Sequence, residues 1–237
     1  MLERSRRPSG WLRHVVRIAA LVSLLALGGA IPAPGAAAVH RVTERSFASG
    51  TTTLVFAKEP QLRFLGRAIN VCVSEGVPAN CPPGATIYLV GGSGWFADLS
   101  AIPQATWIWA PGTTPDTAPA ELAQYHFVTP LLIPGRPTGG TLYFAVDDFA
   151  EAKVNGEVVA SIGSITDVFQ AGAAQNQITA VDIGAFLRPG LNIISVRAQN
   201  GPPEFTGGGC TSPCTYRDHP AGVVFGGTVT YRGGLSL

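Results

Sequence analysis

The sequence predicts an all-β protein folded as an antiparallel β-sandwich. Short runs of β-branched and aromatic residues recur along the 237-residue chain, and 29 Gly and 19 Pro residues are scattered between them. No segment keeps the i, i+3, i+4, i+7 apolar spacing of a helix over ten or more positions. Short strands separated by turn residues are typical of a sandwich or a barrel.

The first 38 residues are expected to be an export signal and not part of the fold. Five Arg residues precede an apolar run at 18–27, and a stretch rich in Ala, Gly and Pro follows it. This order is typical of a secretory signal with its cleavage site. The apolar run is shorter than the roughly 20 residues of a membrane-spanning helix. An uncleaved N-terminal anchor is the alternative, and the export route is left open.

We expect a short linker at 39–46, one sandwich domain at 47–233 and a C-terminal tail at 234–237. The leader holds five of the 16 basic and one of the 15 acidic residues, which leaves 11 basic and 14 acidic residues. Nucleic-acid binding needs clustered Lys and Arg, so no nucleic-acid partner is expected. The mature chain is expected to be secreted or extracytoplasmic and to have no membrane span. Its oligomeric state is not predicted.

Four cysteines, Cys72, Cys81, Cys210 and Cys214, lie in the mature part of the chain. An even number in an exported chain predicts two disulfides, and four cysteines allow three pairings. We favour the two local pairs, because each closes a short loop that contains proline. Zinc is the alternative, but these spacings are not those of a zinc ribbon.

The first half of the domain holds four expected strands. The segment at 85–90 ends at a Gly pair, and the segment at 106–110 ends at Pro111-Gly112, which are turn signals. In the segment 124–133, Pro130 excludes a central ladder position, because proline has no N–H to donate. The strands expected in this half lie at 52–57, 85–90, 106–110 and 124–133.

The second half contains the clearest hairpin. Residues 141–146 alternate, and Asn155-Gly156 supplies the two positive-φ positions of a type I′ turn. Residues 191–198 are expected to form a strong strand after a Pro-Gly turn. A long, partly irregular loop is expected at 161–178, and a long loop at 199–220. The segments expected in this half lie at 141–146, 152–160, 181–183, 191–198, 223–225 and 228–231.

Several motifs occur in an order that resembles a known family. They are Trp107-Ile-Trp109, the segment from Phe127 to Pro134, the strand ending in Asp147-Asp148, Val154-Asn155-Gly156, Asp182-Ile183 with Leu187 to Val196, and Ala221-Gly222-Val223. With them, roughly half of the chain resembles the galactose-binding-domain-like jelly rolls of extracellular carbohydrate-active proteins. The resemblance implies a jelly-roll sandwich, and it speaks to function only by analogy.

Asp147 and Asp148 are candidate ligand residues. Paired carboxylates serve as acid and base or as ligands of hard metals. Neighbours in a strand point to opposite faces, so these two do not form a glycosidase pair. The alternative is a structural role, in which an Asp accepts backbone N–H groups in a turn. No cofactor is expected, and a structural calcium ion is left open.

Aromatic residues supply the other part of the predicted site. Trp95 follows a Gly-rich loop, and Trp109 lies in a short strand; either ring, if exposed, would stack on a sugar, and the alternative for both is the core. Tyr216 and Arg217 follow Cys214 in a loop pinned by a disulfide, where binding groups are common. The alternative there is a solvated loop with a local ion pair.

Catalysis has little support in the sequence. It contains no Gly-x-Ser-x-Gly, no His-Glu-x-x-His and no phosphate-binding Gly-Lys-Ser or Gly-Lys-Thr. We therefore expect a secreted, non-catalytic module that recognises carbohydrate or a glycan-bearing surface. The alternative is a structural or assembly module of the envelope or extracellular space without a small ligand, and a hydrolase is the third reading.

Overall fold

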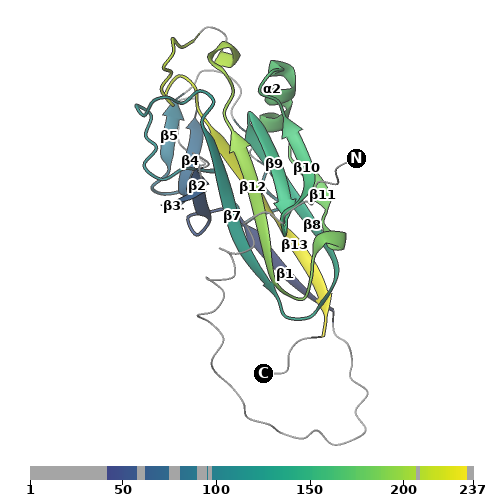
Figure 1. Ribbon diagram of the computed structural model, residues 1–237. Helices are drawn as coiled ribbons and strands as arrows, with labels where there is room; N and C mark the ends of the chain where they lie inside the picture. Colours follow the sequence, from purple (N-terminus) through teal and green to yellow (C-terminus); the bar gives the residue numbers. More distant parts are fainter. Residues whose placement is uncertain are drawn as a thin grey trace, which may run out of the picture. The chain divides into compact units, whose positions relative to one another are not determined.

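The computed structural model describes residues 42–57, 62–74, 81–89, 95, 98–206 and 209–233. Within them, two β-sheets pack face to face (Figure 1), which confirms the all-β sandwich. The expected signal at 1–38 and the tail at 234–237 lie outside the described residues and stay predictions. In the described part of the chain, no helix is long and apolar enough to cross a membrane.

The first sheet has six strands, and its neighbours are all antiparallel. Between β9 and β10, Asn155 and Gly156 both have positive φ angles of 54° and 93°, which confirms the predicted hairpin turn. The strands in spatial order are β10 (Glu157–Gly163), β9 (Phe149–Val154), β12 (Gly190–Gln199), β7 (Gln124–Ile133), β2 (Leu54–Ala57) and β3 (Arg63–Arg67).

The second sheet has seven strands. Its β4 and β5 run parallel, whereas its other described pairs are antiparallel. β1 pairs with β13 from Val42 onward, so residues 42–46 belong to the sheet and not to the linker expected at 39–46. The strands are β11 (Thr179–Asp182), β8 (Arg136–Asp147), β13 (Gly222–Arg232), β6 (Ile108–Trp109), β4 (Ile69–Ser74) and β5 (Thr86–Leu89), with β1 (Val42–Ala48) beside β13.

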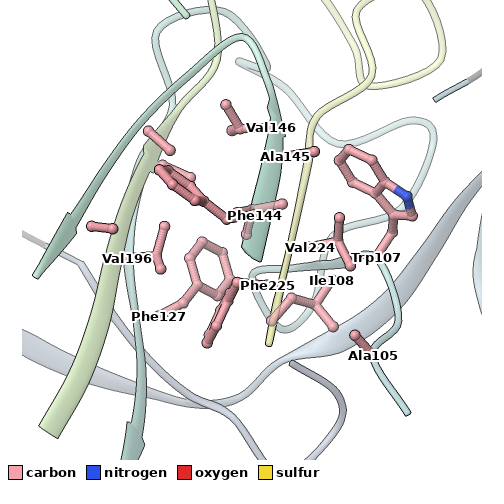
Figure 2. Close-up of a cluster of buried hydrophobic side chains, with 14 of the residues drawn as sticks. Ala105, Trp107, Ile108, Phe127, Phe144, Ala145, Val146, Val196, Val224 and Phe225 are labelled. Atoms are coloured by element: carbon pink, nitrogen blue, oxygen red, sulfur yellow. The ribbon is translucent and has the colours of Figure 1, made fainter. Parts of the chain in front are cut away.

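The core lies between the inner faces of the two sheets (Figure 2). Phe127 of the six-stranded sheet and Phe144 and Phe225 of the seven-stranded sheet have no exposed surface. Each such ring removes much apolar area from water, which is the main favourable term in folding. Ile108 and Val196 are equally buried and complete the cluster.

The structure corrects the long, partly irregular loop expected at 161–178, because half of this segment is a helix that the sequence did not predict. β10 continues to Gly163, and a helix, α2, runs from Val168 to Asn176. The Asp167 carboxylate caps it by accepting hydrogen bonds from the N–H groups of Phe169 and Gln170. The only buried residues of this helix are two alanines, Ala171 and Ala174. Its sequence therefore has no stripe of large apolar residues at the i, i+3, i+4 spacing that predicts a helix.

Both disulfides join the local pairs, as predicted. Cys72 is bonded to Cys81, and Cys210 to Cys214, with sequence separations of 9 and 4. No free cysteine remains in the chain. The zinc alternative is thereby set aside, because all four thiols are used in disulfides.

A pair of glycine substitutions tests the packing around β13. A Cβ added at Gly227 would collide with the backbone carbonyl oxygen of Thr141 on β8 and lie 3.0 Å from the Phe47 ring. We expect Gly227→Ala to lower the free energy of unfolding by about 1–3 kcal/mol, because the paired backbones must move apart. The measurement is urea unfolding followed by tryptophan fluorescence.

Gly172→Ala is the matched control. A Cβ at Gly172 in α2 meets nothing within 4 Å, so the change is expected to raise the free energy of unfolding by up to about 1 kcal/mol through helix propensity. Equal effects of the two substitutions would contradict the described packing of β13.

Candidate functional site

Trp95 is packed inside the protein and not displayed on the surface. Its side chain is 9% exposed, and its ring stacks on Trp107 with 4.6 Å between ring centroids. Its indole Nε1 donates a 2.8 Å hydrogen bond to Asp147 Oδ2. The structure therefore favours the core alternative for Trp95.

Trp109 and Tyr216 also lie in the core. Trp109 has no exposed surface and Tyr216 is 1% exposed, and the Trp109 Nε1 donates a 2.9 Å hydrogen bond to the Tyr216 hydroxyl. Tyr125 meets the Trp109 ring edge-on at 5.4 Å. The structure therefore favours the core alternative for Trp109. The Tyr216 side chain, expected on an exposed loop, is instead buried and anchors that loop to the interior.

For Arg217, the structure favours the alternative of a solvated loop with a local ion pair. Its guanidinium lies 2.6 Å from Asp116, and both side chains are mostly exposed to solvent. Exposed pairs of this kind contribute little stability, since water and salt screen them. The six predicted ligand residues therefore fall into three places: Trp95 with the two Asp residues, Trp109 with Tyr216, and Arg217 alone.

The two aspartates end β8 in a buried polar cluster. The Asp148 Oδ2 accepts a 2.7 Å hydrogen bond from the Gly201 N–H, and the two carboxyl groups bond to each other. Burial, followed by the charge and hydrogen bond of Asp148, raises the pKa of Asp147 well above its ordinary value, while the bond from Trp95 acts in the opposite direction. The hydrogen bond from Gly201 to Asp148 connects the loop after β12 to the end of β8. This is the structural role that the sequence offered as the alternative to ligand binding.

No candidate metal centre emerges from the described residues. Among them, no three His, Cys, Asp or Glu side chains are close enough to hold an ion together.

A pocket of about 220 Å³ opens on the outer face of the six-stranded sheet, where β9, β12 and the end of β10 meet. Cross-strand register builds it: Phe149 lies opposite both Gln199 and Gly163. Ala150 on β9 and Ala198 on β12 are fully buried. Because side chains alternate between the two faces of a strand, the residues next to these alanines, such as Phe149 and Arg197, point outward. The lining residues are Phe149, Gly163, Ser164, Ile165, Arg197 and Gln199.

Arg197 supplies the charge of this pocket. Its guanidinium carbon lies 5.1 Å from the centroid of the Phe149 ring, which is a cation–π distance. Its Nε is 3.7 Å from Glu151 Oε1, and the Lys153 ammonium is 3.0 Å from the same oxygen. The Lys153 hydrogen bond and, less strongly, the Arg197 charge hold the pKa of Glu151 below its ordinary value, although burial opposes them.

The pocket joins an aromatic surface to polar groups of several kinds. Phe149 and Ile165 are apolar, Arg197 carries hydrogen-bond donors, and the Gln199 amide can both donate and accept. The Ser164 hydroxyl oxygen is already engaged, because it accepts hydrogen bonds from the N–H groups of Thr166 and Asp167. None of these six lining residues is among the ligand residues predicted from the sequence. The usable signal was the alternation in Phe149–Val154, which places small apolar residues inward and Phe, Glu and Lys outward.

Comparisons with known proteins give only distant similarities. No protein-family model matches the chain, and no curated protein matches it significantly. Among solved structures, the α-L-rhamnosidase of Streptomyces avermitilis is 22% identical over 55% of this chain and 10% of its own, with a TM-score of 0.36. The β-glucuronidase of Ruminococcus gnavus is 11% identical over 79% of this chain and 29% of its own, with a TM-score of 0.39.

The α-L-rhamnosidase of Aspergillus terreus is 16% identical over 49% of this chain and 13% of its own, with a TM-score of 0.36. This chain thus covers less than a third of the length of each of these three enzymes. Their activities are properties of much longer proteins.

The buried Asp147 carboxyl is expected to make the stability of the fold depend on pH. Because the pKa of Asp147 is raised in the folded state, its stabilising contribution is full below the unfolded pKa of about 3.9 and is lost as pH rises through the folded pKa. An Asn at this position keeps an oxygen for Trp95 and does not titrate. We expect Asp147→Asn to unfold at a higher temperature than the parent at pH 7. Between the unfolded and the folded pKa of Asp147, the free energy of unfolding of the parent should fall by up to about 1.4 kcal/mol per pH unit, and the variant should lack this slope.

The measurement is thermal unfolding from pH 4 to pH 8. Glu157→Gln, which removes an exposed carboxylate on β10, is the control and should leave the pH profile as in the parent. A parent and an Asp147→Asn variant with the same pH profile would show that Asp147 ionises as freely in the fold as in the unfolded chain.

Proposed function

We propose that this chain is a secreted, non-catalytic recognition domain that binds carbohydrate in the pocket beside Phe149. One observation carries the proposal: an aromatic ring, a guanidinium and an amide share one surface pocket. A sugar ring presents C–H groups that pack on apolar and aromatic surface, and hydroxyls that both donate and accept hydrogen bonds. A pocket with an apolar platform and a few placed polar groups suits it.

The dimensions of the pocket favour one ring of a longer glycan. Its volume of about 220 Å³ is below the roughly 300–1,000 Å³ of pockets that enclose a drug-sized ligand. The rest of the glycan would lie along the open outer face, which carries Glu151 and Lys153 next to the pocket. Each hydrogen bond adds about 1 kcal/mol net, so weak binding to a single sugar unit is expected.

Other observations support an extracytoplasmic location and a non-catalytic role. Two disulfides and the predicted export signal favour an extracytoplasmic protein. The resemblance to galactose-binding-like jelly rolls agrees with a sandwich that presents ligands. The carboxyl pair of Asp147 and Asp148 is buried and bonded to Trp95 and Gly201, which suits an anchor better than an acid–base pair.

An assembly function is the second candidate, favoured by apolar side chains at the other end of the same face. Leu132 and Leu191 are partners across β7 and β12, and they are 52% and 41% exposed. Neighbouring exposed apolar side chains support a contact with another protein. A sedimentation experiment that finds a stable dimer, together with no glycan binding, would favour this function.

The test is a glycan-array screen of the exported chain, followed by titration of the best ligand against Phe149→Ala. We expect the substitution to weaken binding about tenfold or more, because the ring forms the floor for the sugar. Phe149→Tyr should retain binding. Melting temperatures of all variants would be recorded to separate binding from folding.

Phe64→Ala is the matched control. Phe64 lies on β3 at the far edge of the same sheet and is 57% exposed, so its removal should leave affinity unchanged. Equal affinity of Phe149→Ala and the parent for every glycan bound would contradict the proposed site.

A further inference from the structure

Arg197 has unused hydrogen-bonding capacity at the edge of the pocket. A guanidinium carries five N–H donors in a fixed planar fork. Within the described residues, the Arg197 side chain makes a cation–π contact with Phe149 and a 3.7 Å ion pair with Glu151, which is too long for a hydrogen bond. Its Nε is buried, so protein atoms cover it from a ligand. The two terminal amino groups of the guanidinium have no hydrogen-bond acceptor among the described residues, and these are the donors that a ligand can reach.

The charge balance around Arg197 is positive. Lys153 and Arg197 share the single carboxylate of Glu151, and Lys153 makes the shorter contact, at 3.0 Å. None of the six residues that line the pocket is acidic. The Arg197 side chain is 25% exposed, so its charge is partly shielded from water yet still reachable by a ligand. An anionic group in the pocket would therefore meet a cation that has only a share of the Glu151 carboxylate.

The cation–π contact with Phe149 also limits where the guanidinium can lie. The N–H donors of a guanidinium project from the edges of its plane. A carboxylate meets such an edge with two parallel hydrogen bonds, a match that a neutral hydroxyl does not offer. A carboxylate attached to a sugar ring lies at the edge of that ring, so the ring itself can still pack on Ile165 and on the part of Phe149 that Arg197 leaves uncovered.

We propose that the pocket selects a sugar that bears a carboxylate, such as a uronic acid unit of a longer glycan, and that Arg197 recognises this carboxylate. The inference rests on the proposed carbohydrate binding and narrows it to acidic glycans. Gln199, the residue opposite Phe149, would bind a hydroxyl of the same unit.

The test is calorimetric titration of the exported chain with oligogalacturonate and with the same oligomer after reduction of its carboxyl groups. We expect the reduced oligomer to bind about tenfold or more weakly, and salt to weaken only the acidic ligand. Arg197→Gln should lose about tenfold in affinity for the acid and leave the reduced oligomer nearly unaffected. Arg197→Lys, which keeps the charge but not the fork, should be intermediate.

Arg217→Gln is the matched control, because it removes an arginine that pairs with Asp116 outside the pocket lining. It should bind as the parent does. Equal affinities for acidic and reduced oligomers, both lost in Phe149→Ala, would overturn this inference and support the proposed function. Binding of a sulfated neutral oligomer as tightly as oligogalacturonate would overturn the preference for carboxylate. Failure to bind any glycan, acidic or neutral, would overturn the proposed function itself.

Discussion

The burial of Phe127, Phe144 and Phe225 between the two sheets is the constraint on which the other features depend. In a strand, successive side chains point to opposite faces, so fixing the inner residues also fixes the outer ones. On β12 the buried Val196 and Ala198 direct Arg197 outward. A shift of one residue would place the guanidinium in the core, so the pocket is a consequence of how the core packs.

The same division separates two groups of acidic side chains. Asp147 and Asp148 lie at the buried end of β8, where one accepts a bond from Trp95 and the other from the Gly201 N–H. Glu151 lies outward on β9 and pairs with two cations at the surface. The carboxyl pair that is most prominent in the sequence therefore secures loops, whereas chemistry suited to a ligand lies on the sheet face.

Local patterns explain what the sequence predicts well. Strand alternation, the Asn155-Gly156 turn and the short cysteine spacings each depend on neighbouring residues, and the structure confirms the sandwich, the hairpin and both disulfides. The burial of Trp109 depends on Tyr216, a hydrogen-bond partner 107 positions away. Likewise, Phe149 and Arg197 meet only through the register of β9 with β12. Such pairings are set by the whole fold, which a single sequence does not display.

An NMR titration with oligogalacturonate would locate the binding site, because the amide signals of residues that contact a ligand shift. We expect shifts at Phe149, Ser164, Ile165, Arg197 and Gln199, and none in the loop at Tyr216 and Arg217. Shifts confined to that loop, with none along β9 and β12, would contradict the proposed site.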